Sequence, residues 1–283
     1  MGGNARVRAP GYPRGSVIRS TFQLTSGIGP WRERQLWSQG VATWEDLEAR
    51  GGGLSPRLDG KLLEAVARAR GALEDGDAGT LSAMLPRRER WRLYPHFEED
   101  AAFLDIETDG GDTVTAVSVL DRDGPRVFLR GRDLDAFPDV TGRWKLLVTF
   151  NGLSFDVPVL RRAFPGWRPP PAHVDLRHVW HRLGHRGGLK LLEEEAGIGR
   201  PPHLAGLGGW DAVLLWRRHL DGDRAALRLL VEYNLYDAVN LRTLMSLAYN
   251  RLLTRFSMPA PPVPVRHRGD VLYDVSRQLL ALA

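Results

Sequence analysis

The sequence predicts an α/β domain that follows a smaller all-α domain. Four short apolar runs have the length and composition of strands: residues 101–106, 113–120, 126–130 and 145–150. Residues 224–249 instead repeat apolar side chains at helical spacing, and residues 17–97 contain helical patterns. A chain of 283 residues has room for two modest domains, which we expect at 17–97 and 98–250.

The composition excludes several classes of protein and site. The hydrophobic fraction of 43% is ample for a folded core, but no segment approaches the ~18–20 apolar residues of a membrane span. The absence of cysteine excludes disulfides, thiolate zinc sites and cysteine nucleophiles. Because no signal-peptide pattern is present either, we expect a cytoplasmic protein with no membrane partner.

Positive charge is concentrated in the front part of the chain. Residues 1–97 carry 15 Lys and Arg against 10 Asp and Glu, whereas the remaining residues carry 24 of each. A basic segment attracts polyanions through long-range electrostatics. We therefore expect a polyanionic substrate or partner.

This basic segment contains a glycine-flanked turn between helical patterns. Residues 22–30 read Phe-Gln-Leu-Thr-Ser-Gly-Ile-Gly-Pro, a helical pattern follows through Trp37, and Thr43 can cap the next helix. The arrangement resembles a helix-hairpin-helix motif, in which Gly27 and Gly29 permit a tight turn and the next helix presents backbone N–H groups to a phosphate. The alternative is a small helical module for packing or protein contact.

The remaining flanking segments give simpler expectations. Further helices are expected at 54–73 and 81–91, followed by a connector at 86–97 that contains four arginines, Arg87, Arg88, Arg90 and Arg92. Residues 1–16, rich in Gly, Pro and Arg, are expected to be disordered. Residues 251–283 should form a stiff Pro-rich linker and an apolar helix at 271–282 that packs back on the domain.

Two of the expected strands lead into acidic residues. Asp105 and Glu107 are two residues apart in a strand, so their side chains project from the same face. Asp156 follows Asn151-Gly152 and falls in the first turns of a helix expected at 153–164. It therefore lies near the carboxyl end of its strand, where open α/β sheets commonly form pockets.

A fourth acid lies on the long helical stretch. Tyr233 and Asp237 are four residues apart and share one helix face. Burying several carboxylates together costs several kcal/mol each unless a partner such as a hard divalent cation compensates them. The pattern indicates a two-metal site for phosphodiester cleavage. A phenol of ordinary pKa, about 10, can orient an attacking water there, and can deprotonate it only with cations nearby.

Three segments carry these residues in order: Asp105-Ile106-Glu107, Asn151-Gly152-x-x-Phe155-Asp156 and Tyr233-x-x-x-Asp237. Over about residues 98–250 they resemble the motifs of the DEDD superfamily of 3′→5′ exonucleases, in its DnaQ-like, YprB-type branch. The resemblance implies a ribonuclease-H-like fold, with a mixed sheet flanked by helices, after the small all-α helix-hairpin-helix-like domain. The position of the tyrosine implies the Tyr-type (DEDDy) class.

The resemblance also implies roles for individual residues. Four metal ligands would bind two Mg²⁺ or Mn²⁺ ions, with Tyr233 orienting the water: Asp105, Glu107, Asp156 and Asp237. The candidate nucleic-acid contacts are Asn151, Lys190, Gly27 and Gly29. For Lys190 a solvated helix position is the alternative, and Asp175 can either support the site or cap a helix at 176–183. Four histidines without metal-ligand spacing are expected at the surface or in a substrate groove: His173, His178, His181 and His185.

The predicted activity is metal-dependent hydrolysis of a phosphodiester at the 3′ end of DNA or RNA. A structure-selective endonuclease could use the same acids. A non-catalytic nucleic-acid-binding or scaffold protein is the third possibility, and the cost of keeping buried carboxylates argues against it.

Overall fold

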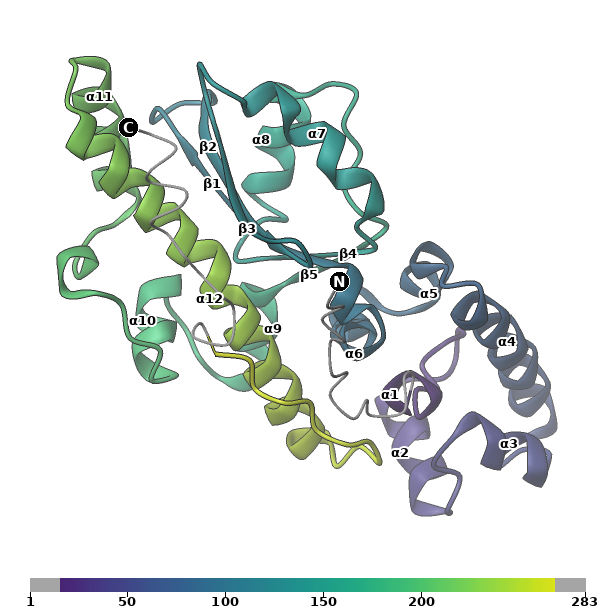
Figure 1. Ribbon diagram of the computed structural model, residues 1–283. Coiled ribbons are helices and arrows are strands. Elements are labelled where there is room, and N and C mark those ends of the chain that lie inside the picture. Colours follow the sequence, from purple (N-terminus) through teal and green to yellow (C-terminus); the bar gives the residue numbers. More distant parts are fainter. Residues whose placement is uncertain (1–15, 268–283) are drawn as a thin grey trace, which may run out of the picture.

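The computed structural model describes residues 16–267 (Figure 1). Two expectations lie outside this range, the disorder of residues 1–15 and the helix at 271–282. Ser16, which we expected to be disordered, is the first residue of α1. Within residues 16–267, no helix has the length and apolar composition needed to cross a membrane.

A five-stranded mixed sheet lies at the centre of the α/β domain (Figure 1). Its strands are β1 (Ala101–Thr108), β2 (Val114–Asp121), β3 (Gly124–Leu129), β4 (Leu146–Thr149) and β5 (Ala172–Asp175). They are arranged in the order β3-β2-β1-β4-β5, with antiparallel pairing from β3 to β1 and parallel pairing from β1 to β5. The expected mixed sheet is confirmed. The fifth strand was not predicted from the sequence.

Helices cover both faces of the sheet (Figure 1). One face packs against α7 (Phe137–Val140) and α8 (Asp156–Ala163). The other packs against α9 (Leu176–Leu183), α11 (Gly209–Leu220) and α12 (Arg224–Phe256). Shorter helices fill the connections: η3 (Leu134–Ala136), η4 (Thr141–Arg143), α10 (Leu189–Glu195) and η5 (Pro202–Leu204).

Side chains of β1 alternate between these two helical layers. Leu104 and Ile106 belong to the core formed with α7 and α8, whereas Phe103 belongs to the core formed with α12. Asp105 and Glu107 have the same parity as Phe103, so both face the α12 layer.

The front segment is helical, as expected. It comprises α1 (Ser16–Arg19), α2 (Pro30–Ser38), α3 (Trp44–Arg50), α4 (Pro56–Glu74), α5 (Ala78–Met84), η1 (Arg87–Leu93), α6 (Tyr94–Phe97) and η2 (Glu98–Asp100). Thr43 caps α3, and the side chain of Asp46 bonds back to the Thr43 backbone. The prediction of a single helix at 81–91 is wrong. The chain turns at Pro86, and this segment forms two helices, α5 and η1.

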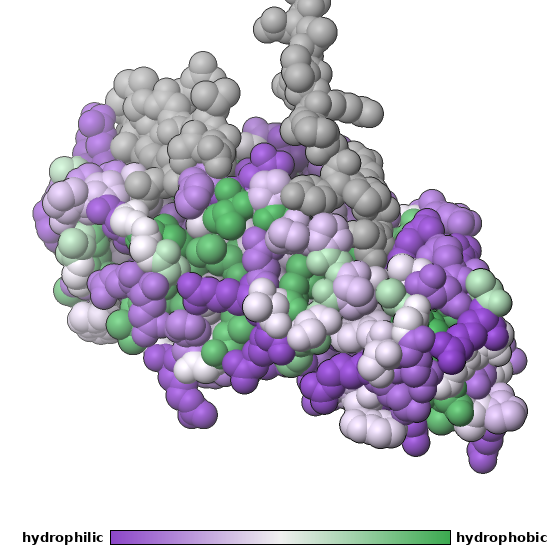
Figure 2. All heavy atoms as spheres, turned by 90° about the horizontal axis from the view of Figure 1, so that it is seen from below, coloured by the Kyte–Doolittle hydropathy of each residue, from purple (hydrophilic) through white to green (hydrophobic). Residues whose placement is uncertain are grey.

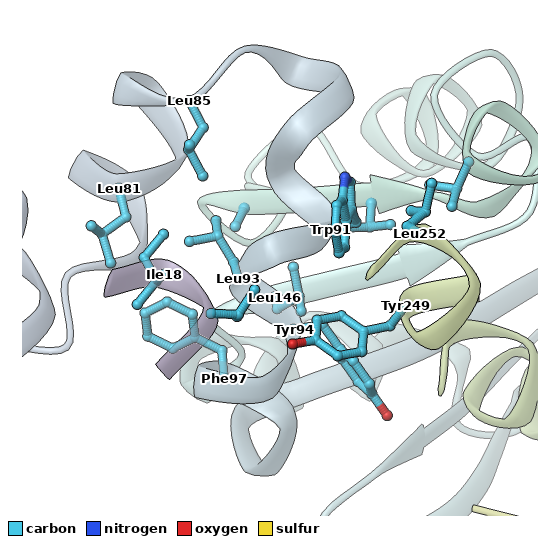
Figure 3. Close-up of a cluster of buried hydrophobic side chains, with 14 of the residues drawn as sticks. Ile18, Leu81, Leu85, Trp91, Leu93, Tyr94, Phe97, Leu146, Tyr249 and Leu252 are labelled. Atoms are coloured by element: carbon cyan, nitrogen blue, oxygen red, sulfur yellow. The ribbon is translucent and has the colours of Figure 1, made fainter. Parts of the chain in front are cut away.

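One hydrophobic core joins these helices to the α/β domain. Figure 3 shows Ile18 and Leu81 of the front helices in the same cluster as Leu146 of β4 and Tyr249 of α12. The rings of Trp91 and Tyr249 meet edge to face, 5.5 Å between centroids. On the surface shown in Figure 2, hydrophilic residues cover most of the end at which Figure 1 places α2, α3 and α4.

Arg92 is buried in an ion-pair network between α2 and η1. Its guanidinium donates to Glu33 at 2.7 Å and to Glu89 at 2.9 Å, and all three side chains are almost fully buried. Glu33 also accepts a hydrogen bond from the backbone N–H of Phe22 at 2.8 Å. The charge of Arg92 is therefore compensated inside the fold, unlike that of a solvated connector arginine.

The long helix and the Pro-rich linker pack together. The helix expected at 224–249 continues to Phe256. The linker then returns along it: Asn250 exchanges hydrogen bonds of 2.8 Å with the backbone of Val263, and Thr243 donates to the carbonyl of Arg266 at 2.6 Å.

Candidate active site

Asp105 and Glu107 lie on the central part of the sheet. In β1 they are opposite Ser118 and Ala116 of β2, and both project toward α12. Glu107 is buried, with 8% of its surface exposed, and Asp105 is partly buried. Two acids are thus held on a rigid strand with little access to water.

α12 brings three polar residues to the same place. Tyr233 and Asp237 line the cavity that contains Asp105 and Glu107, as their spacing on one helix face predicted. Between them in sequence, the fully buried Asn234 donates from Nδ2 to Oδ2 of Asp105 at 2.7 Å. No role for Asn234 was predicted from the sequence.

Asp156 is the first residue of α8 and lines the same cavity. The turn before it is tightly constrained, because Asn151 has a left-handed backbone with φ of 67°. A Cβ on Gly152 would come within 2.2 Å of Thr149 Oγ1, so only glycine fits there. The turn directs the chain from the end of β4 into α8 and places Asp156 in the cavity.

The four carboxylates line one cavity of about 410 Å³. Oxygen atoms of Asp105, Glu107 and Asp237 all lie within 4.8 Å of one another. Burial, followed by repulsion from Asp237, raises the pKa of Asp105 and that of Glu107 well above their ordinary values. Burial and the neighbouring Asp175 raise the pKa of Asp156 to about 7, although backbone N–H groups oppose the shift.

This donor set fits hard divalent cations. Mg²⁺ and Mn²⁺ prefer carboxylate oxygens, and a cation among these groups would remove the repulsion that raises their pKa values. Asp105, Glu107 and Asp237 could hold one ion together, and Asp156 borders the same cavity.

Tyr233 retains its proton at neutral pH. Burial and then the charges of Asp237, Glu107 and Asp105 raise the pKa of its phenol above the ordinary value of 10. Arg200, whose guanidinium carbon lies 5.7 Å from the ring centroid, opposes this shift without reversing it. The hydroxyl is therefore suited to orienting a water by hydrogen bonding.

Two cations approach Asp237. Lys190 lines the cavity, and both its ammonium and the guanidinium of Arg200 contact the Asp237 carboxylate. Arg200 also bonds to the buried Glu193 at 2.6 Å. Burial lowers the pKa of Arg200, but Glu193 and Asp237 outweigh it and raise the pKa overall. Arg200 was missed in the sequence because its loop has no regular pattern linking it to α12.

Asp175 supports the turn below the cavity. Its carboxylate accepts hydrogen bonds from the backbone N–H groups of Asn151 at 2.8 Å, Leu153 at 3.0 Å and Arg177 at 3.0 Å. It thus both caps α9 and fixes the turn. Asn151 lines the cavity, where its side-chain oxygen accepts from Arg177 at 2.7 Å.

The histidines are distributed over several environments. His173 contacts Thr149 at 2.8 Å, and burial lowers its pKa to about 4, so it is neutral at pH 7. His185 pairs with Glu195, while His178 and His181 are exposed. Within residues 16–267 the group able to hold a metal is the acidic triad, without any histidine.

Gly27 and Gly29 lie in the front helices, apart from this cavity. Gly27 has a left-handed backbone with φ of 91°, and its carbonyl accepts from Arg32. Gly29 is the residue before α2, and Pro30 opens that helix. The tight turn is present, and phosphate binding there stays a prediction.

Comparison with known families agrees with this fold. Residues 102–249, from the second residue of β1 to the last third of α12, match the family profile of the RNase H superfamily. The matched region contains all four carboxylates and Tyr233. No curated protein and no solved structure matches the chain significantly.

Proposed function

Since the chain belongs to the RNase H superfamily, we propose that it is a divalent-metal-dependent 3′→5′ exonuclease of the Tyr-type DEDD class. The observation that carries the proposal is the meeting of four carboxylates from three separate elements beside the buried phenol of Tyr233. The nuclease-type fold supports hydrolysis of nucleic acid. The polarity of digestion rests on the motif resemblance described above.

We assign the four carboxylates to metal binding. Asp105, Glu107, Asp156 and Asp237 would hold two Mg²⁺ or Mn²⁺ ions, as their oxygen donors and close spacing favour. When bound, such ions supply a water of lowered pKa and stabilise the charge on the leaving oxygen.

Two further side chains would contact the attacking water and the substrate phosphate. Tyr233 Oη keeps its proton and orients the attacking water, which places the oxygen for in-line attack. Lys190, at the edge of the cavity, offers its ammonium to a non-bridging phosphate oxygen of the substrate.

The test uses the full chain with Mn²⁺ and 5′-labelled DNA or RNA. A ladder that shortens from the 3′ end is expected, and Asp105→Asn should abolish it. Asp135→Asn is the matched control, since it removes the same charge at an exposed position outside the cavity. Internal products would instead indicate an endonuclease, and intact substrate would leave the binding-protein alternative.

A further inference from the structure

A second cavity lies at the β5 edge of the sheet, between η1 and α9. Its volume is about 350 Å³. Its walls carry four arginines and one acid, Asp175, together with apolar side chains; the arginines are Arg87, Arg88, Arg90 and Arg182. We call it the arginine pocket.

The positive charge of this pocket is only partly compensated. Within residues 16–267, neither Arg87 nor Arg90 has a carboxylate within ion-pair distance, and Arg90 donates to the carbonyl of Ser82 at 3.1 Å. Burial and the neighbouring charge of Arg87 lower the pKa of Arg90, as expected where positive charges accumulate. Asp175 contributes one negative charge to the pocket wall, against the positive charges of four guanidinium groups.

Specific contacts between three elements fix one wall of the pocket. Arg182 donates to the carbonyl of Arg88 at 2.9 Å and to the buried Glu89 at 2.7 Å, and it lies 4.3 Å from the centroid of the Phe256 ring. These contacts join α9, η1 and α12 and fix the wall of the pocket. The position of Arg182 in this wall is therefore set by the fold.

Trp91 forms part of the apolar wall of the pocket. Its indole lies beside Leu252 (Figure 3) and is 99% buried, and Nε1 has no acceptor among the described residues. Guanidinium groups bind phosphate oxygens through charge-assisted hydrogen bonds, so the arginines suit a phosphate group.

The arginine pocket adjoins the carboxylate cavity. Asn151 lines the carboxylate cavity and Leu153 lines the arginine pocket, so one short turn separates them. Asp175 holds both residues through their backbone N–H groups. A strand with one phosphate among the carboxylates can therefore cross Leu153, which is 42% exposed, and reach the arginines.

We infer that the arginine pocket binds a phosphodiester group of the substrate strand, a short distance along the strand from the bond that is cleaved. This inference rests on the proposed function for the identity of the strand. It gives Arg87, Arg88 and Arg90 of η1, three arginines of the basic front segment, a role in holding the strand.

The binding arm of the test needs no catalysis. A fluorescent single-stranded oligonucleotide is titrated with the full chain in EDTA over a range of salt concentrations. The double variant Arg87→Gln/Arg90→Gln should bind more weakly, and its slope of log affinity against log salt should fall by about 0.7 for each phosphate group that the variant no longer binds. Both side chains are at least partly exposed and bear no ion pair among residues 16–267, so the variant should fold.

The matched control removes two arginines at the opposite edge of the sheet. Arg224 and Arg228 are exposed on the first turns of α12, and Arg224 lines a pocket beside β3. Arg224→Gln/Arg228→Gln should leave affinity and slope unchanged. Equal affinity and slope in wild type and the Arg87/Arg90 variant would overturn the inference and leave the pocket to an acidic protein segment.

The catalytic arm separates this inference from the proposed function. A nitrophenyl ester of a mononucleotide reaches only the carboxylate cavity, so the Arg87/Arg90 variant should cleave it at the wild-type rate. The same variant should show a raised KM on a long oligonucleotide with kcat retained. Failure of the wild type to cleave either substrate would refute the proposed function, while the binding arm would still decide the role of the pocket.

Discussion

Asn234 on α12 donates a 2.7 Å hydrogen bond from Nδ2 to Oδ2 of Asp105 on β1. Asn234 is fully buried, so this bond is formed away from competing water. It orients the carboxylate of Asp105 relative to Tyr233 and Asp237, the neighbours of Asn234 on the helix. A metal ligand held by a fixed partner binds its ion more tightly than one that must be ordered.

Replacing Asn234 with leucine should weaken metal binding. The substitution keeps the approximate volume but removes the donor, and loss of such a supporting bond typically costs about 10–100-fold in metal affinity. Mn²⁺ titration followed by calorimetry would measure it. Asn250→Leu, on the same helix but bonded to the linker, should leave Mn²⁺ affinity unchanged; equal affinities in both variants and wild type would contradict the role given to Asn234.

Divalent metal should raise the melting temperature of the wild type. The clustered carboxylates repel one another, and an ion that binds only the folded state stabilises it by mass action. Asp105→Asn should lose most of the Mn²⁺-induced rise, while its melting temperature in EDTA should be no lower than that of the wild type. A full rise in the variant would refute Asp105 as a ligand.

Stability without metal should depend on pH through Asp156. Its folded pKa of about 7 lies above the ordinary value of 3.8, so the folded protein binds this proton more tightly than the unfolded chain. The resulting stability is fully present below about pH 3.8 and is lost as pH rises through about 7. The free energy of unfolding should therefore fall by up to about 1.4 kcal/mol per pH unit in this window.

Urea unfolding in EDTA at several pH values would measure this dependence. Asp156→Asn cannot titrate, so its unfolding free energy should fall less steeply between pH 4 and 7. Parallel curves for variant and wild type would show that Asp156 does not carry the effect.

Tyr233→Phe should separate catalysis from metal binding. The variant keeps the ring but removes the hydroxyl that orients the water, so cleavage should slow by ~10²–10⁴-fold. The Mn²⁺-induced rise in melting temperature should be retained, because the phenol is not a proposed ligand. Tyr249→Phe loses a hydroxyl that bonds to the linker and should cleave normally. Wild-type activity in Tyr233→Phe would leave Tyr233 with a packing role only.

Arg92→Met should strongly destabilise the fold. It would leave Glu33 and Glu89 buried without their shared partner, and breaking a buried ion pair in this way costs roughly 3–5 kcal/mol. Arg88→Met, an exposed neighbour in η1, should change the unfolding free energy by roughly 0.5 kcal/mol or less. Chemical denaturation compares the two, and a similar small loss in both would contradict the network.

The sequence was most informative where chemistry and local periodicity coincide. The parity of Asp105 and Glu107, and the four-residue spacing of Tyr233 and Asp237, follow from strand and helix geometry alone. Both pairs line the cavity. The mixed sheet, in contrast, was expected through the family resemblance, since strand order depends on contacts distant in sequence.

The features that the sequence did not predict share one physical origin: they depend on contacts between residues far apart in the sequence. β5 has only four residues and follows three prolines, so its strand character comes from pairing with β4. Arg92 resembled its solvated neighbours in sequence, and only its packing against Glu33 distinguishes it. Arg200 and Asn234 act through partners on other elements, which no local pattern reveals.

The hydrophobic cluster that contains Ile18, Leu81, Leu146 and Tyr249 has a consequence for how the chain comes apart. Side chains of the front helices and of the sheet are buried against each other, so neither part can melt without exposing the apolar surface of the other. Heating should give a single cooperative transition, reported alike by probes at both ends. The front helices therefore cannot be replaced or removed independently of the α/β domain. A graft or deletion ending near residue 97 would remove Trp91 and Tyr94, whose rings contact Tyr249.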